Sequence, residues 1–328
     1  MAILATCLPC ACASGTEAPR APTSSAVPST SAAERWLTQL DREQVPVGKI
    51  WDVSAGAFVT EPVLAERVAK ARFVLLGERH DNPDHHRLQA RVVQQLVRAG
   101  RHPALVLEML EPSQQDLADR YLATPNATAA GFGPAVGWEK TSWPPFSEYQ
   151  PIFEAAFAGK LAVVAGNLAQ ADVKALVKQG ASALGGAREH ELGLDQPFPE
   201  ALQAPLLDEL RASHCGQLPE ELLPSMALAQ RARDAQLAKS MLAVAATDGA
   251  VLIAGGGHAR LDRAVPRYLA AAAPGSTVVS ISLREVRHGQ TDPSSYAAPS
   301  EEGPFDYVWF TPRGTDEDPC ASFHHPKQ

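Results

Sequence analysis

Four short runs of apolar residues constrain the fold of this chain more than any other feature. None of them alternates with polar residues, and each is bounded by charged or turn-forming residues. Continuous apolar runs of this length are typical of parallel strands that are buried on both faces. The sequence therefore predicts an α/β protein with a mostly parallel sheet flanked by helices. The four runs are 73–76, 104–107, 161–165 and 251–254.

The first two runs are joined by a segment with clear helical signals. Asn82 is a suitable N-cap, Pro83 suits the first helical position, and apolar residues recur at three- and four-residue spacing until Gly100. Strand, helix and strand together make a crossover unit, which places two parallel strands with their carboxyl ends on the same edge of the sheet.

Weaker patterns predict the outer strands and the helical insertions. A short hairpin is expected around Gly56, and further strands at 277–283 and 307–310, the last being more exposed. Helical periodicity broken by Pro and Gly predicts insertions near 112–158 and 170–247, which form a small cap.

Composition excludes several classes of protein. The chain has a formal net charge of −8, 45% hydrophobic and 20% charged residues, and no basic cluster. This balance excludes global disorder and lacks the positive patch that a nucleic-acid binder needs. No apolar stretch is long enough to cross a bilayer, so the folded part is expected to be soluble with a small-molecule partner.

The N-terminus has the pattern of an exported protein. Residues 1–12 read as a degenerate signal with a partial lipobox, and residues 13–34 form a flexible Ser/Thr/Pro/Ala tether before a domain at 35–313 and a polar, disordered tail at 314–328. Two cysteines remain in the body, Cys215 and Cys320, and the sequence alone leaves open whether they pair.

Acidic and imidazole side chains follow three of the predicted strands. Glu78 and His80 come after the first run, Glu108 after the second, and His258 after the glycines that end the fourth. Because parallel strands end on one edge, we expect these four side chains to meet there. Such a cluster could ligate a divalent metal ion or act as an acid and a base.

Tyr149, Asn167 and one of two neighbouring histidines are further candidates for the same pocket. His85 and His86 point in different directions, so we expect one to line the pocket and the other to be solvated. Tyr149 belongs to an aromatic segment of the first insertion, and Asn167 follows the third run, where it could bond a ligand. The chain has no Walker loop, GxGxxG, GxSxG or HExxH motif, which removes the main support for a nucleotide binder or serine hydrolase.

Seven segments together resemble the ChaN-like haem-binding family of the Tiki superfamily. The longest is LLGERHDNPDHHRLQ at 75–89, and their order and spacing also match. The other segments are LVLEML at 105–110, YQPIFEAA at 149–156, VAGNLAQ at 164–170, SHCGQLP at 213–219, AQRARDAQLAKSM at 229–241 and LIAGGGHARLDRAVPRYL at 252–269.

The resemblance implies a haem-binding protein of the bacterial cell envelope that acts in haem and iron uptake. It implies a lipid anchor in the outer membrane, a domain facing the periplasm, and an outer-membrane haem receptor as a partner. The candidate axial ligands are Tyr149, His80 and His258. A surface-bound haem could be shared between two chains, so a homodimer is compatible with this function.

Two other functions stay open at this point. The superfamily includes metal-dependent peptidases and erythromycin-esterase-like hydrolases, and in that case the four strand-end residues would bind a divalent metal or activate water. A purely structural envelope protein is the third alternative, and it requires the strand-end cluster to be accidental.

Overall fold

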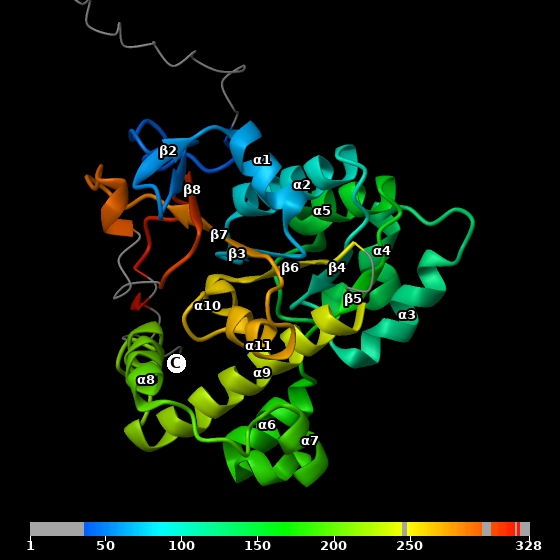
Figure 1. Ribbon diagram of the computed structural model, residues 1–328, viewed down its shortest axis with the longest axis vertical. Coiled ribbons are helices and arrows are strands. Elements are labelled where there is room, and N and C mark those ends of the chain that lie inside the picture. Colours follow the sequence, from blue (N-terminus) through cyan, green and yellow to red (C-terminus); the bar gives the residue numbers. More distant parts are fainter. Residues whose placement is uncertain (1–35, 245–247, 297–302, 319, 322–328) are drawn as a thin grey trace, which may run out of the picture. The chain divides into compact units, whose positions relative to one another are not determined.

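One eight-stranded sheet organises the part of the chain that the computed structural model describes (Figure 1). The described residues are 36–244, 248–296, 303–318 and 320–321, so the predicted signal and tether lie outside them. The strand order is β2-β1-β8-β7-β3-β6-β4-β5. The strands are β1 (Ile50–Asp52), β2 (Ala57–Val59), β3 (Phe73–Glu78), β4 (Ala104–Leu107), β5 (Val163–Ala165), β6 (Ala250–Gly255), β7 (Val278–Glu285) and β8 (Tyr307–Thr311).

The six strands from β8 to β5 pair in parallel, whereas β1 pairs antiparallel with both β8 and β2. The predicted mostly parallel sheet is thus confirmed. Strand β6 enters between β3 and β4, although it follows them by more than 140 residues in the sequence. The order places the ends of β3, β6 and β4 side by side.

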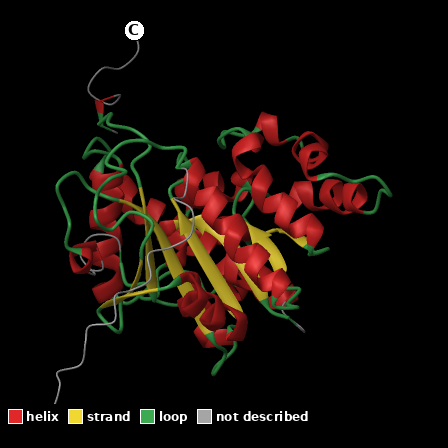
Figure 2. Cartoon of the chain, turned by 90° about the horizontal axis from the view of Figure 1, so that it is seen from above, coloured by secondary structure: helices red, strands yellow, loops and turns green. Residues whose placement is uncertain are grey.

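Helices cover both faces of the sheet, as Figure 2 shows from above. Both predicted insertions consist of helices and turns apart from residues 245–247, which are not described. The helices are α1 (Glu61–Lys70), α2 (Pro83–Arg98), α3 (Pro112–Leu122), α4 (Ala129–Val136), α5 (Phe146–Ala158), α6 (Gln170–Gln179), α7 (Gly186–Glu191), α8 (Glu200–Ser213), α9 (Leu223–Val244), α10 (Gly256–Ala259) and α11 (Val265–Ala272), with short 3-10 turns at Trp138–Lys140, Ala181–Leu184, Glu220–Leu222 and Pro293–Tyr296.

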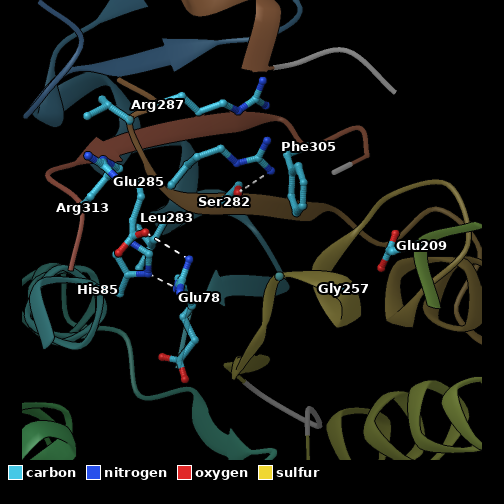
Figure 3. Close-up of a pocket in the computed structure, with 14 residues that line it drawn as sticks. Glu78, His85, Glu209, Gly257, Ser282, Leu283, Glu285, Arg287, Phe305 and Arg313 are labelled. Atoms are coloured by element: carbon cyan, nitrogen blue, oxygen red, sulfur yellow. Dashed lines mark hydrogen bonds and ion pairs between the residues drawn. The ribbon is translucent and has the colours of Figure 1, made fainter. Parts of the chain in front are cut away.

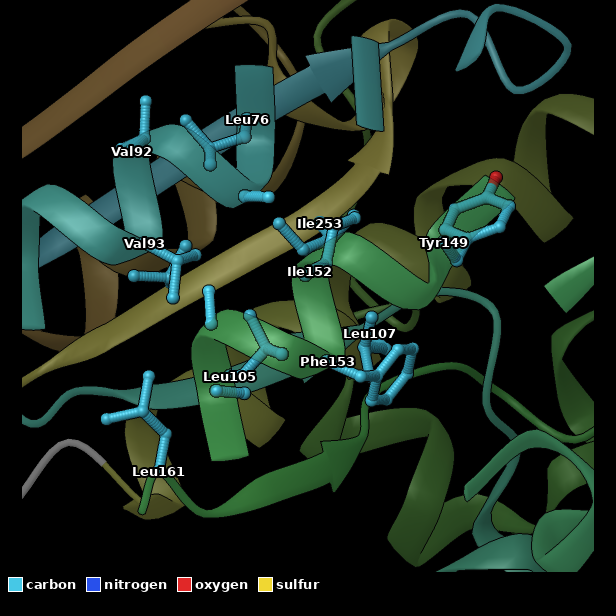
Figure 4. Packing of buried hydrophobic residues seen from close by; sticks show 14 of the residues in the cluster. Leu76, Val92, Val93, Leu105, Leu107, Tyr149, Ile152, Phe153, Leu161 and Ile253 are labelled. Atoms are coloured by element: carbon cyan, nitrogen blue, oxygen red, sulfur yellow. The ribbon is translucent and has the colours of Figure 1, made fainter. Parts of the chain in front are cut away.

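Successive side chains of β3 pack alternately into two separate hydrophobic cores, one on each face of the sheet. Val74 and Leu76 pack in the large core with α2 and α5, whose Val93 and Phe153 appear in Figure 4. Phe73 and its alternate neighbours face the other side, where α9 and α11 cover the sheet. Because a strand alternates its side chains, an apolar run this continuous is buried on both faces.

Helix α2 begins as its sequence predicts. The Asn82 side chain accepts a hydrogen bond from the backbone N–H of Asp84 at 3.0 Å, and Pro83 occupies the first turn. Gly100 follows the helix with φ +75°, a left-handed conformation that glycine adopts without steric cost. The start of α2 therefore lies directly after β3, at the edge where the site forms.

The structure corrects one strand prediction and adds detail to the tail. Strand β8, expected to be exposed, is buried throughout because it lies between β1 and β7 and its side chains enter cores on both faces. In the tail predicted to be disordered, Gly314 donates to Glu285 and Cys320 forms a disulfide with Cys215; residues 319 and 322–328 are not described. No described helix is long and apolar enough to span a membrane.

Candidate functional site

The predicted strand-end cluster forms at the carboxyl edge of β3, β6 and β4. Glu78 closes β3, Glu108 directly follows β4, and His258 lies in the short helix α10 after β6. His80 lies in the loop between β3 and α2. The side chains of Glu78, His80, Glu108 and His258 lie in one connected network of contacts, as expected. They meet because β3, β6 and β4 pair in parallel, so that these strands end at the same edge of the sheet.

Glu78 is a buried carboxylate held from three sides. Its Oε1 accepts a hydrogen bond from the Tyr149 hydroxyl at 2.8 Å and lies 2.7 Å from Nδ1 of His80. Its Oε2 lies 3.3 Å from Nε2 of His86. Burial opposes the charge of Glu78, but His86 and His80 outweigh it and hold the pKa of this carboxyl below its usual range. Glu78 is therefore ionised and fixed in place.

Glu108 is the second buried carboxylate, and its partners come from different elements. The backbone N–H of Gly255 donates to its Oε2 at 2.7 Å, Arg233 of α9 donates to its Oε1, and Nε2 of His258 lies 3.4 Å from that same oxygen. On the far side of the ring, Nδ1 of His258 lies 2.6 Å from Asp234. The result is a chain of alternating charges that runs from the strand edge into α9.

The charged groups around Glu108 stabilise one another. Burial opposes the charge of Glu108, but His258 and Arg233 lower the pKa of its carboxyl well below the usual range. Burial likewise opposes charge on His258, yet Glu108 and Asp234 raise its pKa to about 9. Burial raises the pKa of Asp234. His258 is thus a charged imidazole between two carboxyl groups at neutral pH.

His80 lies between Glu78 and Glu108 and is the partly exposed member of the cluster. Its Nε2 lies 3.8 Å from Oε2 of Glu108, and 32% of its side chain is exposed. The ring meets that of Trp143 edge-on at 4.8 Å. A Cβ at Gly255 would lie 2.9 Å from Nε2, so a residue without a side chain is required there. Burial opposes charge on His80, but Glu78 and Glu108 raise its pKa.

Two cavities border the cluster. One of about 430 Å³ lies between the ends of β3 and β7 and the start of α10; Figure 3 shows Glu78 and His85 on one side and Glu209 of α8 on the other. A second cavity, of about 420 Å³, opens beside Glu108 and is bordered by Trp143 and Arg233. Both volumes fall in the usual range of small-molecule pockets.

His85 lies at the cavity wall, but both of its ring nitrogens form hydrogen bonds within the protein. Its Nδ1 accepts a hydrogen bond from the backbone N–H of Arg79 at 2.9 Å, so Nε2 carries the proton that it donates to Thr311 at 2.9 Å. Burial lowers the pKa of His85 to about 3. The expectation that either His85 or His86 is solvated is wrong, because both rings are buried. His86 stacks on Tyr149 under Glu78.

Asn167 holds the backbone of Glu108 in place through a hydrogen bond. Its Nδ2 donates to the backbone carbonyl of Glu108 at 2.8 Å, and its Oδ1 accepts from Nε of Arg233 at 3.1 Å. Asn167 therefore connects the end of β4 to α9, and its position beside the second cavity leaves its ligand-binding role a prediction.

A divalent metal ion held by several side chains of the cluster has no support in this geometry. Within the described residues, no group of three His, Cys, Asp or Glu side chains is arranged to hold a metal ion. Several members of the cluster pair with one another through hydrogen bonds and ion pairs. Oε2 of Glu78 and both ring nitrogens of His86 are buried without a hydrogen-bond partner.

Three partners of the cluster were not predicted from the sequence. Arg233 and Asp234 are neighbours in AQRARDAQLAKSM, a segment noted for its resemblance but given no role, and their charges in a largely apolar helix are the signal that could have drawn attention to them. His86 was treated only as the alternative to its neighbour. Its contact with Glu78 depends on how α2 packs against β3, which one sequence does not reveal.

Comparison with known proteins agrees with this fold. Residues 64–269 match the family described as haem-binding uptake, Tiki superfamily, ChaN. The fold is similar to a solved structure described as cofacial haem binding to ChaN of Campylobacter jejuni, with a TM-score of 0.62, 20% identity, and coverage of 79% of this chain and 95% of that one. No curated protein matches the chain.

Other solved structures are less similar. The type III effector HopBA1 has a TM-score of 0.39 and 14% identity, with 76% of this chain and 91% of that chain covered. An erythromycin esterase in its open conformation has a TM-score of 0.37 and 15% identity, with 68% and 72% covered.

Proposed function

The chain belongs to the haem-binding uptake family of the Tiki superfamily that includes ChaN, and from this premise we propose that it binds haem at the strand-end cluster during haem uptake. The observation that carries the site is His80, the partly exposed imidazole of the buried cluster. Haem would supply an iron centre whose axial position accepts an imidazole nitrogen or a phenolate oxygen. Both cavities beside the cluster have the volume of a small-molecule pocket, which fits a ligand at this edge.

His80 has the arrangement of a metal-ligating histidine. Its Nδ1 is bonded to the ionised carboxylate of Glu78, which fixes the ring and directs Nε2 outward from that bond. A carboxylate on the second ring nitrogen is the usual partner of a ligating imidazole, because it fixes the tautomer and makes the free nitrogen more basic. We therefore propose that Nε2 of His80 would hold the haem iron.

The other two ligand candidates are less suited to this role. Tyr149 is fully buried and its hydroxyl donates to Glu78, so ligation would require the side chain to leave the core. His258 exposes only 5% of its side chain, and its ring nitrogens lie 2.6 Å from Asp234 and 3.4 Å from Glu108. His80 exposes 32% of its side chain, and its Nε2 is farther from the nearest carboxylate, at 3.8 Å from Glu108. We propose that Tyr149 and His258 position the two carboxylates on either side of His80.

Location outside the cytoplasm follows from the family and is supported by a disulfide. Cys215 and Cys320 are joined across 105 residues of sequence. Structural disulfides persist in oxidising compartments such as the bacterial periplasm. We further propose lipid anchoring to the outer membrane, through the N-terminal cysteines outside the described residues, and delivery of haem from an outer-membrane receptor. A homodimer that shares haem remains compatible with a partly exposed site.

Haemin titration of the purified full chain, followed through the Soret band, tests the proposal. Wild type is expected to give a saturable Soret shift, His80→Ala to lose it, and His258→Gln to keep it with altered affinity. His190→Ala is the matched control, because this histidine is largely exposed and its side chain pairs with Asp195, outside the cluster. An unchanged spectrum for His80→Ala would remove His80 as the ligand, and no saturable shift in wild type would refute haem binding.

A further inference from the structure

Two buried arginines share a single partly exposed carboxylate beside the cavity at α10. Arg260 and Arg263 follow α10 and expose 4% and 5% of their side chains, whereas Glu209 of α8 exposes 38%. Glu209 Oε2 accepts from Arg263 and lies 3.3 Å from Nη1 of Arg260. Buried guanidinium groups require compensating charge, and both arginines receive it from Glu209 of helix α8, which borders the cavity.

The arginines are not equally well compensated. Arg260 has a second acidic partner, Asp262, at 2.7 Å. Within the described residues, Glu209 is the only acidic side chain in an ion pair with Arg263, and Nη1 of Arg263 is buried without a hydrogen-bond partner. Arg263 can therefore donate to one more acceptor than the protein supplies.

Helix α8, which carries Glu209, is weakly anchored. Leu206 is the one fully buried residue among its fourteen, and its main packing partner is α9. Few buried apolar contacts mean that a small movement of this helix costs little free energy. The Cys215–Cys320 disulfide begins two residues after α8 and limits how far the helix can move.

Three glycines, 255–257, form the turn from the end of β6 into α10, and this glycine turn lies between the arginine pair and the proposed haem site. At its start, a Cβ on Gly255 would lie 2.9 Å from Nε2 of His80; at its end, a Cβ on Gly257 would lie 3.7 Å from Oε1 of Glu209. Gly256 and Gly257 also line the cavity of about 430 Å³. Because the turn has no side chains, a flat ligand lying over it could approach His80 at one end and the carboxylate of Glu209 at the other.

We propose that Arg260 and Arg263 form a binding site for a ligand carboxylate, and that Glu209 occupies this site until the ligand displaces it. The proposal rests on the proposed function, since haem carries two propionate groups, and it identifies which residues receive one of them. A planar guanidinium donates two parallel hydrogen bonds to one carboxylate, which explains the choice of arginine over lysine. The incoming carboxylate replaces the charge of Glu209 one for one, so the arginines stay neutralised.

The test compares haemin with haemin dimethyl ester, which lacks the propionate charges. Glu209→Gln removes the competing carboxylate and is expected to tighten haemin binding about tenfold, the effect of one charge-assisted hydrogen bond, while leaving the ester unchanged. Asp208→Asn is the matched control on the same helix, because Asp208 pairs with Arg211 and not with the arginine site. This control is expected to change neither affinity.

A second variant tests the arginine side of the site. Arg263→Gln is expected to weaken haemin binding about tenfold with little effect on the ester, with thermal melting used to verify that the variant folds. Equal effects on haemin and its ester in both variants would overturn the carboxylate site.

Iron-free protoporphyrin IX separates this inference from the proposed ligand. If Glu209→Gln tightens protoporphyrin IX but His80→Ala leaves the haemin spectrum unchanged, the carboxylate site stands and the iron ligand is wrong. If His80→Ala abolishes the Soret shift while Glu209→Gln affects neither porphyrin, the proposed function stands and the carboxylate site is refuted.

Discussion

Removing the hydroxyl of Tyr149 is expected to destabilise the fold measurably while preserving its packing. The hydroxyl is buried and donates at 2.8 Å to Oε1 of Glu78, a carboxylate without solvent access. A hydrogen bond to a buried charge contributes about 1.5–3 kcal/mol, and Tyr149→Phe keeps the ring stacked on His86. His80 still neutralises Glu78, so we expect a loss of about 2 kcal/mol in the free energy of unfolding.

Urea denaturation of both proteins gives this difference from the shift in midpoint at constant slope. Tyr121→Phe is the matched control: its hydroxyl forms hydrogen bonds with the backbone of Thr128 at an exposed position, so a loss of about 1 kcal/mol or less is expected. In a Glu78→Gln background, the effect of Tyr149→Phe should shrink, because the charge is gone. An unchanged midpoint for Tyr149→Phe would refute the buried contact with Glu78.

Three further predictions follow from other contacts. Cys215→Ser should lower stability by about 3 kcal/mol in denaturant, since the bond to Cys320 closes a loop of 105 residues, and an unchanged midpoint would exclude the bond. Gly255→Ala should leave the fold intact but reduce haemin affinity by displacing His80, so wild-type affinity would contradict the placement of that ring. Because the pKa of His85 falls to about 3, the unfolded chain takes up a proton below pH 6.5 that the folded chain refuses, so stability should fall from pH 6.5 toward 3; His85→Gln should flatten that slope.

Local patterns predicted the parallel strands well because each run had to be buried on both faces. The continuous apolar character of β3 and β6 implied helices on either side, and the crossover through α2 fixed the shared edge. Strand β8 was misjudged because 307–310 is rich in aromatic residues, and the Tyr and Trp among them carry a polar atom that suits a partly exposed position. Its neighbour β1 is antiparallel and comes from the far N-terminal part of the domain, a pairing that the local sequence does not contain.

The site was predictable as far as it followed from strand ends. Glu78, Glu108 and His258 meet because β3, β4 and β6 are neighbours in the sheet. The partners that set their charge come from helices that cross the sheet edge, and helix packing angles are not encoded in a short motif. Arg233 and His86 therefore became visible only in three dimensions.

A structure of the haemin complex tests the central claim most directly. We expect the iron to lie within bonding distance of Nε2 of His80, while Nδ1 of that ring remains bonded to Glu78 and Tyr149 still donates to the carboxylate. Iron bonded to Tyr149 or His258, or a porphyrin located away from the carboxyl edge of β3, β6 and β4, would contradict it.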